Sequence, residues 1–125
     1  MKKIIFTKDA PAPIGPYSQA TMVNGILYTS GQIPINPATG ELVKESIESE
    51  TTQVMENLKA VLKAANMTFE NVFKTTIFIS DMENFSKINA IYGTYFNGDT
   101  APARETVEVA NLPLYVNVEI SVIAV

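Results

Sequence analysis

The sequence predicts an α+β protein in which two helices cover one face of a mixed sheet of about six strands. Residues 49–67 and 84–96 repeat their apolar side chains with the period of an amphipathic helix. The β-branched and aromatic runs around them stop at Gly, Pro or Asn, which is typical of strands. The segments follow the order β-β-β-α-β-α-β-β without a linker, so we expect residues 1–125 to form a single domain.

The first three strands are expected at residues 3–6, 17–23 and 26–32. The first is short and suits an edge of the sheet. Residues 9–16 contain Pro11, Pro13 and Pro16, which predict a stiff loop because proline fits neither a helix interior nor a central strand. Asn24-Gly25 predicts a two-residue hairpin turn, since both turn positions favour positive φ.

An apolar stripe identifies each helix. The stripe of the first helix consists of Val54, Leu58, Val61, Leu62 and Ala65. Ser49 is its expected N-cap. The stripe of the second helix consists of Phe85, Ile88, Tyr92 and Tyr95. Asn97-Gly98 is expected to end that helix, and residues 72–79 predict a strand between the two.

The last two strands, at residues 101–109 and 115–125, contain the first candidate site. Apolar residues alternate along the second of them, which leaves Glu119 in the middle of the other face. In the first, the valines mark the apolar face, so Arg104, Thr106 and Glu108 are expected on the polar face. The same alternation places Glu105 on the apolar face. If the strands pair, Arg104 and Glu119 share one polar face inside a largely apolar sheet.

The composition excludes several kinds of site. The chain has no Cys and no His, which removes disulfides, zinc–thiolate sites, cysteine nucleophiles, Ser-His-Asp triads and histidine-based metal sites. Its net charge of −4, without a Lys/Arg cluster, argues against a nucleic-acid or anionic-membrane partner. No apolar run is long enough to span a bilayer, and the N-terminus lacks a signal-peptide core, so we expect a cytoplasmic protein.

Five separated stretches of the chain match one family pattern. They are Ala12-Pro13-Ile14-Gly15-Pro16-Tyr17-Ser18-Gln19-Ala20, Thr29-Ser30-Gly31-Gln32-Ile33-Pro34, Asn89-Ala90 with Tyr92 and Phe96, Pro102-Ala103-Arg104, and Val118-Glu119-Ile120. In these stretches, the chain resembles the RidA/YjgF family of reactive-intermediate deaminases over its whole length. The resemblance implies a chorismate-mutase-like fold and a homotrimer in which the open sheet faces form a central barrel and three sites lie between subunits.

The resemblance also implies an activity. Enzymes of the deaminase branch hydrolyse 2-imino acids such as 2-iminopropanoate and 2-iminobutanoate to 2-keto acids and ammonia. These imines arise from enamines that pyridoxal-phosphate-dependent dehydratases release. The resemblance implies a small-molecule substrate and no metal or cofactor.

Three residues are the expected catalytic group. Arg104 is expected to hold the substrate carboxylate with its planar fork of donors; a structural ion pair with Glu119 or Glu108 is the alternative. By resemblance, Glu119 orients or deprotonates the attacking water, or else it only orients Arg104. Thr106 occupies a position where many relatives have cysteine, and the resemblance implies that its backbone carbonyl helps to hold the water. On the strand pattern alone, Thr106 is an ordinary β-branched residue.

Four further residues are expected to bind the substrate. The resemblance places Tyr17 over the pocket, Ser30 and Gly31 along its lining, and Asn89 at an interface between subunits. On the residues alone, Tyr17 also suits a packed loop aromatic, Ser30-Gly31 a hairpin end, and Asn89 a solvated helix face.

Two other functions stay open at the sequence level. One is a non-catalytic trimer that binds a small carboxylate and requires Arg104 but not Glu119. The other is an endoribonuclease that inhibits translation, an activity attributed to some relatives. The net charge of −4 and the lack of a basic groove argue against the second.

Overall fold

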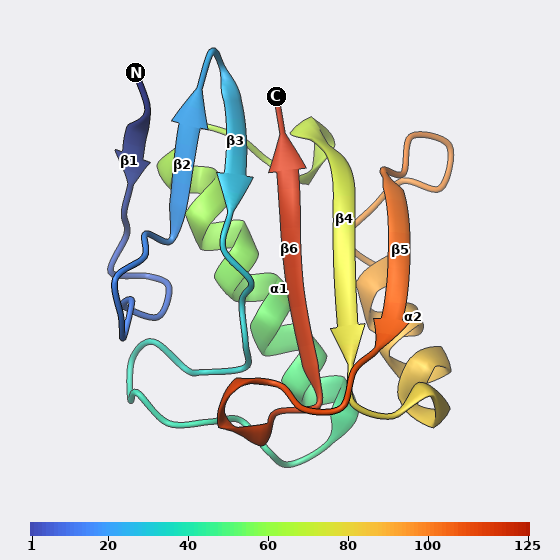
Figure 1. Ribbon diagram of the computed structural model, residues 1–125. Helices are drawn as coiled ribbons and strands as arrows, with labels where there is room; N and C mark the ends of the chain where they lie inside the picture. The colour runs from blue at the N-terminus through green and yellow to red at the C-terminus, as the bar shows by residue number, and fades with distance from the viewer.

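In the computed structural model, which describes residues 1–125, six strands form one sheet and two helices lie behind it (Figure 1). The strands are β1 (Lys3–Ile5), β2 (Ala20–Val23), β3 (Ile26–Thr29), β4 (Val72–Ile79), β5 (Ala103–Glu108) and β6 (Val118–Ala124). The helices are α1 (Ile47–Ala64) and α2 (Phe85–Gly93). The predicted order of elements and the predicted α+β layer are therefore confirmed. No helix has the length and apolarity needed to cross a membrane.

The sheet has the strand order β1-β2-β3-β6-β4-β5. All neighbours are antiparallel except β4 and β5, which are parallel. The parallel pair follows from the connection, because the chain passes through α2 between these strands and returns to the same end of the sheet. The short N-terminal strand lies at one edge, as predicted, and β5 forms the other.

The hairpin prediction is confirmed by the backbone. Asn24 and Gly25 have φ values of 51° and 79°, and β2 and β3 pair directly on either side of them. Both strands are shorter than predicted. Gln19, which was expected in the second strand, lies just before it. Its Nε2 atom donates hydrogen bonds to the carbonyl oxygens of Thr7 and Pro11, each at 2.9 Å, and so holds the proline-rich loop in place.

The helix boundaries differ from the prediction at both ends of each helix; α1 ends at Ala64 and not at residue 67. The N-cap of α1 is Ser46, and Ser49 is its reciprocal partner three residues later in a capping box. The helix therefore starts earlier than residue 49. The second helix is shorter than predicted mainly because it ends at Gly93, with Thr94 as its C-cap, and not at Asn97-Gly98 as expected. At its other end, Met82–Asn84 forms a 3₁₀ turn, capped by the Asp81 side chain, before α2 begins.

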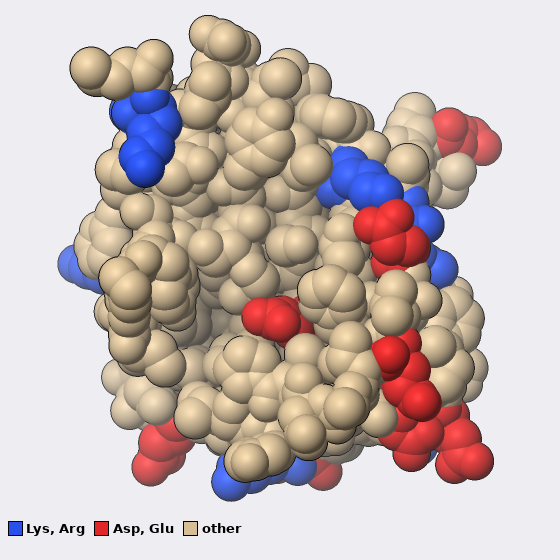
Figure 2. Space-filling model, viewed as in Figure 1, with Lys and Arg blue, Asp and Glu red and all other residues tan.

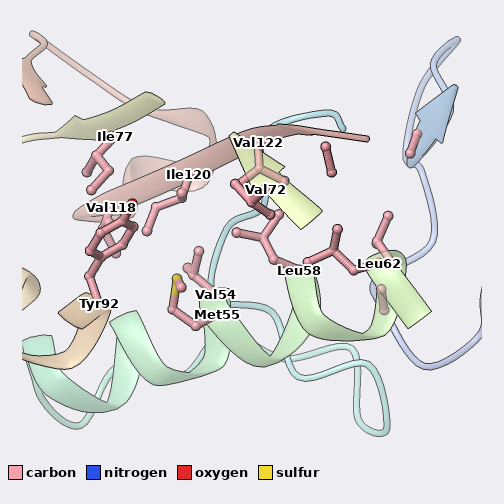
Figure 3. Packing of buried hydrophobic residues seen from close by; sticks show 14 of the residues in the cluster. Val54, Met55, Leu58, Leu62, Val72, Ile77, Tyr92, Val118, Ile120 and Val122 are labelled. Carbon is pink, nitrogen blue, oxygen red and sulfur yellow. The ribbon is translucent and has the colours of Figure 1, made fainter. Parts of the chain in front are cut away.

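The core lies between the sheet and α1. The predicted stripe residues Val54, Leu58 and Leu62 are fully buried and face Ile120 and Val122 of β6 (Figure 3). Hydrophobic burial thus fixes which face of β6 points to the helices, and it confirms that its even-numbered positions form the apolar face. Glu119 accordingly points to the other face, which no helix covers; this is called the open face below.

The predicted position of Arg104 relative to Glu119 is wrong. Arg104 pairs in register with Thr75 of β4, a fully buried residue on the helix side of the sheet. Arg104 and Glu119 therefore lie on opposite faces of one sheet. The error was in the phase of β5: Val107, taken as a marker of the core face, lies on the open face and is 42% exposed. Since β5 is an edge strand, its valines do not report which face is buried.

Glu105 is displaced by the same correction. It lies on the open face, where it forms an ion pair with Lys74 of β4 and accepts a hydrogen bond from the Thr76 hydroxyl at 2.9 Å. The Lys74 hydrogen bond and, secondarily, the Thr76 hydrogen bond lower the pKa of Glu105. The expectation that Glu105 points to the core is therefore wrong.

Candidate functional site

Arg104 lies between the edge strand β5 and helix α2. Its Nη1 atom donates a hydrogen bond to Asn89 Oδ1 at 2.7 Å. The guanidinium carbon also lies 5.0 Å from the ring centroid of Tyr92 and 5.6 Å from that of Phe85, within the range of cation–π attraction. The remaining N–H groups of Arg104 have no partner in the protein. They are free to bind an anion.

Thr106 follows on the same face of β5. It pairs in register with Ile77 of β4, which is buried on the helix side. The Oγ1 atom of Thr106 is buried and has no hydrogen-bond partner. The structure therefore brings Arg104, Asn89 and Thr106 to one edge of the molecule, and the Thr106 hydroxyl contributes no internal hydrogen bond there.

Glu119 lies on the open face, as the second residue of the central strand β6. Figure 2 shows that this face carries one acidic group near its centre, with uncharged atoms around it. Its carboxylate makes no hydrogen bond or ion pair, and burial raises its pKa above the ordinary value. A desolvated carboxylate without donors holds a proton more readily, so it is a stronger base than an exposed one.

Gly31 lies directly against Glu119. An isolated bridge between Gln32 and Ile120, with hydrogen bonds of 2.8 and 3.1 Å, holds the chain at this position. A Cβ atom at Gly31 would lie 2.6 Å from Glu119 Cδ and 2.8 Å from Cγ, closer than atoms normally approach. Only glycine leaves room for the carboxylate where it lies.

Tyr17 and Ser30 lie near Gly31 but differ in what they offer. Tyr17 is half exposed, and together with Gly31 it lines a small hollow of about 30 Å³. The Ser30 hydroxyl donates to the Ser18 carbonyl at 2.6 Å, so it already fastens the loop that carries Tyr17. Within one chain, Tyr17, Ser30 and Gly31 therefore lie on the side of Glu119 and not beside Arg104.

Comparisons with known proteins agree with this fold over its whole length. The family model described as Endoribonuclease L-PSP matches residues 7–125. The crystal structure of YyfA from Yersinia pestis, described as a protein of unknown function of the conserved Rid family, is similar with a TM-score of 0.96 and 56% sequence identity, covering 99% of this chain and 98% of that one. The chain belongs to the RidA/YjgF family.

One further relative is named for an activity, and another is described with a bound ligand. A mouse protein named 2-iminobutanoate/2-iminopropanoate deaminase is 47% identical over 125 residues, covering 100% of this chain and 92% of the mouse protein. The crystal structure of Escherichia coli TdcF, described with bound serine, has a TM-score of 0.92 and 41% identity, covering 98% of each chain.

Several features of this RidA/YjgF chain were not found from its sequence. The contact of Tyr92 and Phe85 with Arg104 was missed because both were assigned only to the core stripe of α2. The available signal was their spacing: Phe85, Asn89 and Tyr92 occupy positions i, i+4 and i+7, which lie on one helix face. The ion pair between Lys74 and Glu105 was missed through the phase error in β5.

The largest surface hollow does not coincide with the candidate residues. It measures about 630 Å³, runs along α1, and contains none of the expected site residues. Its buried amide, Asn57, is fully used: Oδ1 accepts from Gln53, and Nδ2 donates to the Ile33 and Ile35 carbonyls. We therefore assign the site by the free donors of Arg104 and the unpaired carboxylate of Glu119. No cluster of three His, Cys, Asp or Glu side chains is arranged to hold a metal ion.

Proposed function

We propose that this RidA/YjgF protein hydrolyses reactive 2-imino acids, such as 2-iminopropanoate and 2-iminobutanoate, to 2-keto acids and ammonia. One observation carries the proposal: the chain presents an arginine with free donors on one side of the sheet and an unpaired, desolvated carboxylate on the other. These are the two groups that a carboxylate-bearing imine requires. The name of the mouse relative supports the same reaction.

Arg104 binds the substrate carboxylate in this proposal. A guanidinium stays charged in any surroundings and matches a carboxylate with two parallel N–H donors. Asn89 occupies Nη1 and leaves the other donors available. The imino carbon, which is bonded directly to the carboxylate carbon, is then held in a fixed position beside the site.

Glu119 transfers protons in two steps. In the first, water forms a C–O bond with the imino carbon, the C=N π electrons move to nitrogen, and Glu119 carries a proton from the water to that nitrogen. In the second, Glu119 carries the proton of the new hydroxyl to the amine; the C–N bond breaks, a C=O bond forms, and ammonia leaves. The raised pKa of Glu119 suits a group that must both accept and donate a proton.

The site is proposed to form between copies of the chain. Arg104 and Glu119 lie on opposite faces of one sheet, so a single small substrate does not reach both in the same chain. A second copy that places its open face against the β5 edge brings its own Glu119 to the first copy's Arg104. The open face exposes apolar side chains, among them Tyr28 and Val107, which favours burial against another chain. The homotrimer expected from the family is the assembly that we propose.

A coupled assay tests the reaction. A threonine or serine dehydratase generates the imine, and keto-acid release is followed with and without the protein. Arg104→Ala should lower kcat/KM by roughly 10²-fold, equivalent to about 2–4 kcal/mol of lost transition-state binding. Lys59→Ala, which removes an exposed positive charge on α1, is the control and should leave the rate unchanged. Equal acceleration by wild type and Arg104→Ala contradicts the proposal.

Subunit mixing tests the shared site. Arg104→Ala and Glu119→Gln should each be inactive alone. After joint unfolding and reassembly of equal amounts, about a quarter of the interfaces should combine an intact Arg104 with an intact Glu119 in a cyclic assembly. Activity should return to that fraction. A mixture of Arg104→Ala with the double variant Arg104→Ala/Glu119→Gln has no such interface and should stay inactive. Recovery in neither mixture argues for a site within one chain.

A second candidate function is the binding of a small carboxylate without turnover. The bound serine of TdcF favours it, because serine also carries a carboxylate next to a nitrogen-bearing carbon. Such a protein needs Arg104 but not Glu119. Saturable 2-oxobutanoate binding that Glu119→Gln leaves intact, together with no turnover by wild type, would replace the deaminase proposal.

The family description also names an endoribonuclease. The net charge of −4 disfavours an RNA groove on this chain. RNA cleavage by nuclease-free protein, lost in Arg104→Ala, would establish that activity; intact RNA would exclude it.

A further inference from the structure

Arg104 is the only arginine in the chain, and one face of α2 is arranged around its guanidinium. Phe85, Asn89 and Tyr92 form a line along that face. Asn89 Oδ1 accepts the Nη1 hydrogen bond at 2.7 Å, and the two rings lie 5.6 and 5.0 Å from the guanidinium carbon. The arginine is thus held by three side chains before any substrate is present.

The contacts use different parts of the guanidinium. An aromatic ring attracts its flat face, whereas hydrogen bonds form at the N–H groups around its edge. Asn89 accepts a hydrogen bond from one N–H group of Arg104, and neither ring accepts one. The rings and Asn89 therefore hold the guanidinium while its other N–H groups, which can bind a carboxylate, stay free. A long arginine side chain that is already ordered loses less conformational entropy when it binds its ligand.

Tyr92 is itself fixed in place. It is only 5% exposed, and its hydroxyl donates to Thr75 Oγ1 at 3.1 Å. Its ring also packs on Phe96, with centroids 4.7 Å apart. Thr75 is the residue of β4 that pairs in register with Arg104. The ring and the guanidinium are therefore anchored to adjacent positions on neighbouring strands. Burial raises the pKa of Tyr92, so its hydroxyl stays protonated and keeps this hydrogen bond at neutral pH.

We propose that Tyr92 is a positioning residue whose ring, together with the Asn89 carbonyl, holds Arg104 in the orientation that binds a carboxylate. The inference rests on the proposed function of Arg104. It changes the role expected for Asn89, which acts through Arg104, and it adds Tyr92, which the sequence placed only in the core.

The single arginine allows a test that does not depend on activity. In ¹⁵N-labelled protein, Arg104 gives the only arginine Nε–H signal, and the nearby rings should shift it from the position of free arginine. Tyr92→Leu should move the signal towards that position. Phe69→Leu is the matched control, because Phe69 belongs to the same aromatic cluster through Tyr95 and Phe96 but does not touch Arg104. An unchanged signal in folded Tyr92→Leu overturns the proposal.

Kinetics supply the second measurement. A contact made equally in the bound and transition states changes KM and leaves kcat. Tyr92→Leu should therefore raise KM for the imine, and Kd for 2-oxobutanoate, by about 5- to 30-fold, the effect of losing a cation–π contact of partly desolvated groups. Tyr92→Phe keeps the ring and should restore most of the affinity. A loss in kcat alone, or an equal loss in Tyr92→Phe, overturns the role of the ring.

Asn89→Ala keeps the test valid if Tyr92→Leu does not fold. Asn89 is exposed, so its removal should spare the fold while it shifts the Arg104 signal and weakens 2-oxobutanoate binding. A folded Asn89→Ala protein with unchanged signal and affinity contradicts the proposal. If wild type proves to have no deaminase activity, the proposed function fails, yet the Arg104 signal and the 2-oxobutanoate Kd still decide whether α2 positions the arginine.

Discussion

The contact between Gly31 and Glu119 allows the proposed chemistry to be tested apart from the fold. In Gly31→Ala, the new methyl carbon would lie 2.6 Å from Glu119 Cδ, whereas ordinary contacts begin at 3.4 Å. The carboxyl group must therefore retreat by roughly 0.8 Å, the difference between these distances. A misplacement of about 1 Å at a reacting group costs on the order of 10²-fold in rate.

The same substitution should have little effect on stability. Gly31 does not have positive φ, so its backbone accepts alanine. The displaced group is the end of a flexible side chain, and an off-rotamer torsion costs about 0.5–1.5 kcal/mol. Alanine also restricts the unfolded chain, which offsets roughly 0.4–1 kcal/mol of that cost. The free energy of unfolding should change by less than about 1 kcal/mol while kcat falls by about 10²-fold.

The assay compares deamination and urea unfolding of Gly31→Ala with those of Gly25→Ala. Gly25 has a φ of 79° with no atom near its missing Cβ, so alanine there strains the hairpin turn without touching the site. It should lower stability by about 1 kcal/mol and leave kcat/KM unchanged. Full activity in Gly31→Ala would refute the reasoning, because Glu119 would then not be needed where the structure places it. A shared loss of stability and activity would refute it as well.

Four further predictions concern three individual side chains. The pKa of Glu119 in the folded protein lies above the ordinary value of 4.5, which applies to the unfolded chain, so its charge opposes folding at neutral pH. Stability therefore falls as the pH rises from 4.5 to the raised pKa of the folded state. Glu119→Gln should raise Tm at neutral pH and give no gain below pH 4.5. Keto-acid release by wild type should also fall as the pH drops through that raised pKa. Thr106→Val should raise the free energy of unfolding by about 1 kcal/mol, because it removes a buried hydroxyl without a partner. The variant should keep its activity if only the backbone carbonyl of residue 106 acts. An inactive but stable variant would show that the hydroxyl is used. Lys74→Glu sets two carboxylates against each other on the open face. In light scattering it should reduce the particle mass from that of the proposed homotrimer, three times 13.7 kDa, towards that of one chain; an unchanged mass would place that face outside the interface.

Most of the fold was predictable because local chemistry determined it. The Asn24-Gly25 turn, the buried strand Val72–Ile79 and the stripe of α1 each carry their own signal in a short window. The start of α1 was less predictable, because Ser46 and Ser49 are both good caps. The structure uses them together, and a single-residue cap rule does not choose between the two ends of a capping box.

The site was less predictable because it depends on the phase of an edge strand. In β6, burial against α1 selects one face, and the sequence shows it clearly. In β5, neither face is fully buried, so valine at 107 and arginine at 104 do not reveal which side the helix covers. Only the pairing of Arg104 with Thr75 settles the phase. A shift of one residue in the phase of a strand exchanges its two faces. Here that shift places Arg104 and Glu119 on opposite faces, whereas the alternation of the sequence predicted one shared face.

This separation explains why both groups keep the properties that the proposed reaction needs. Had Arg104 and Glu119 shared a face within reach of each other, they would have formed an ion pair, the alternative that the sequence left open. The pair would have occupied the donors of Arg104 and lowered the pKa of Glu119, leaving a weak base and a blocked carboxylate site. With the sheet between them, Arg104 keeps free N–H groups and Glu119 keeps a raised pKa. In the proposed assembly, a substrate whose carboxylate faces Arg104 would stand between that arginine and the Glu119 of the partner subunit, so that binding itself would keep the two charges apart.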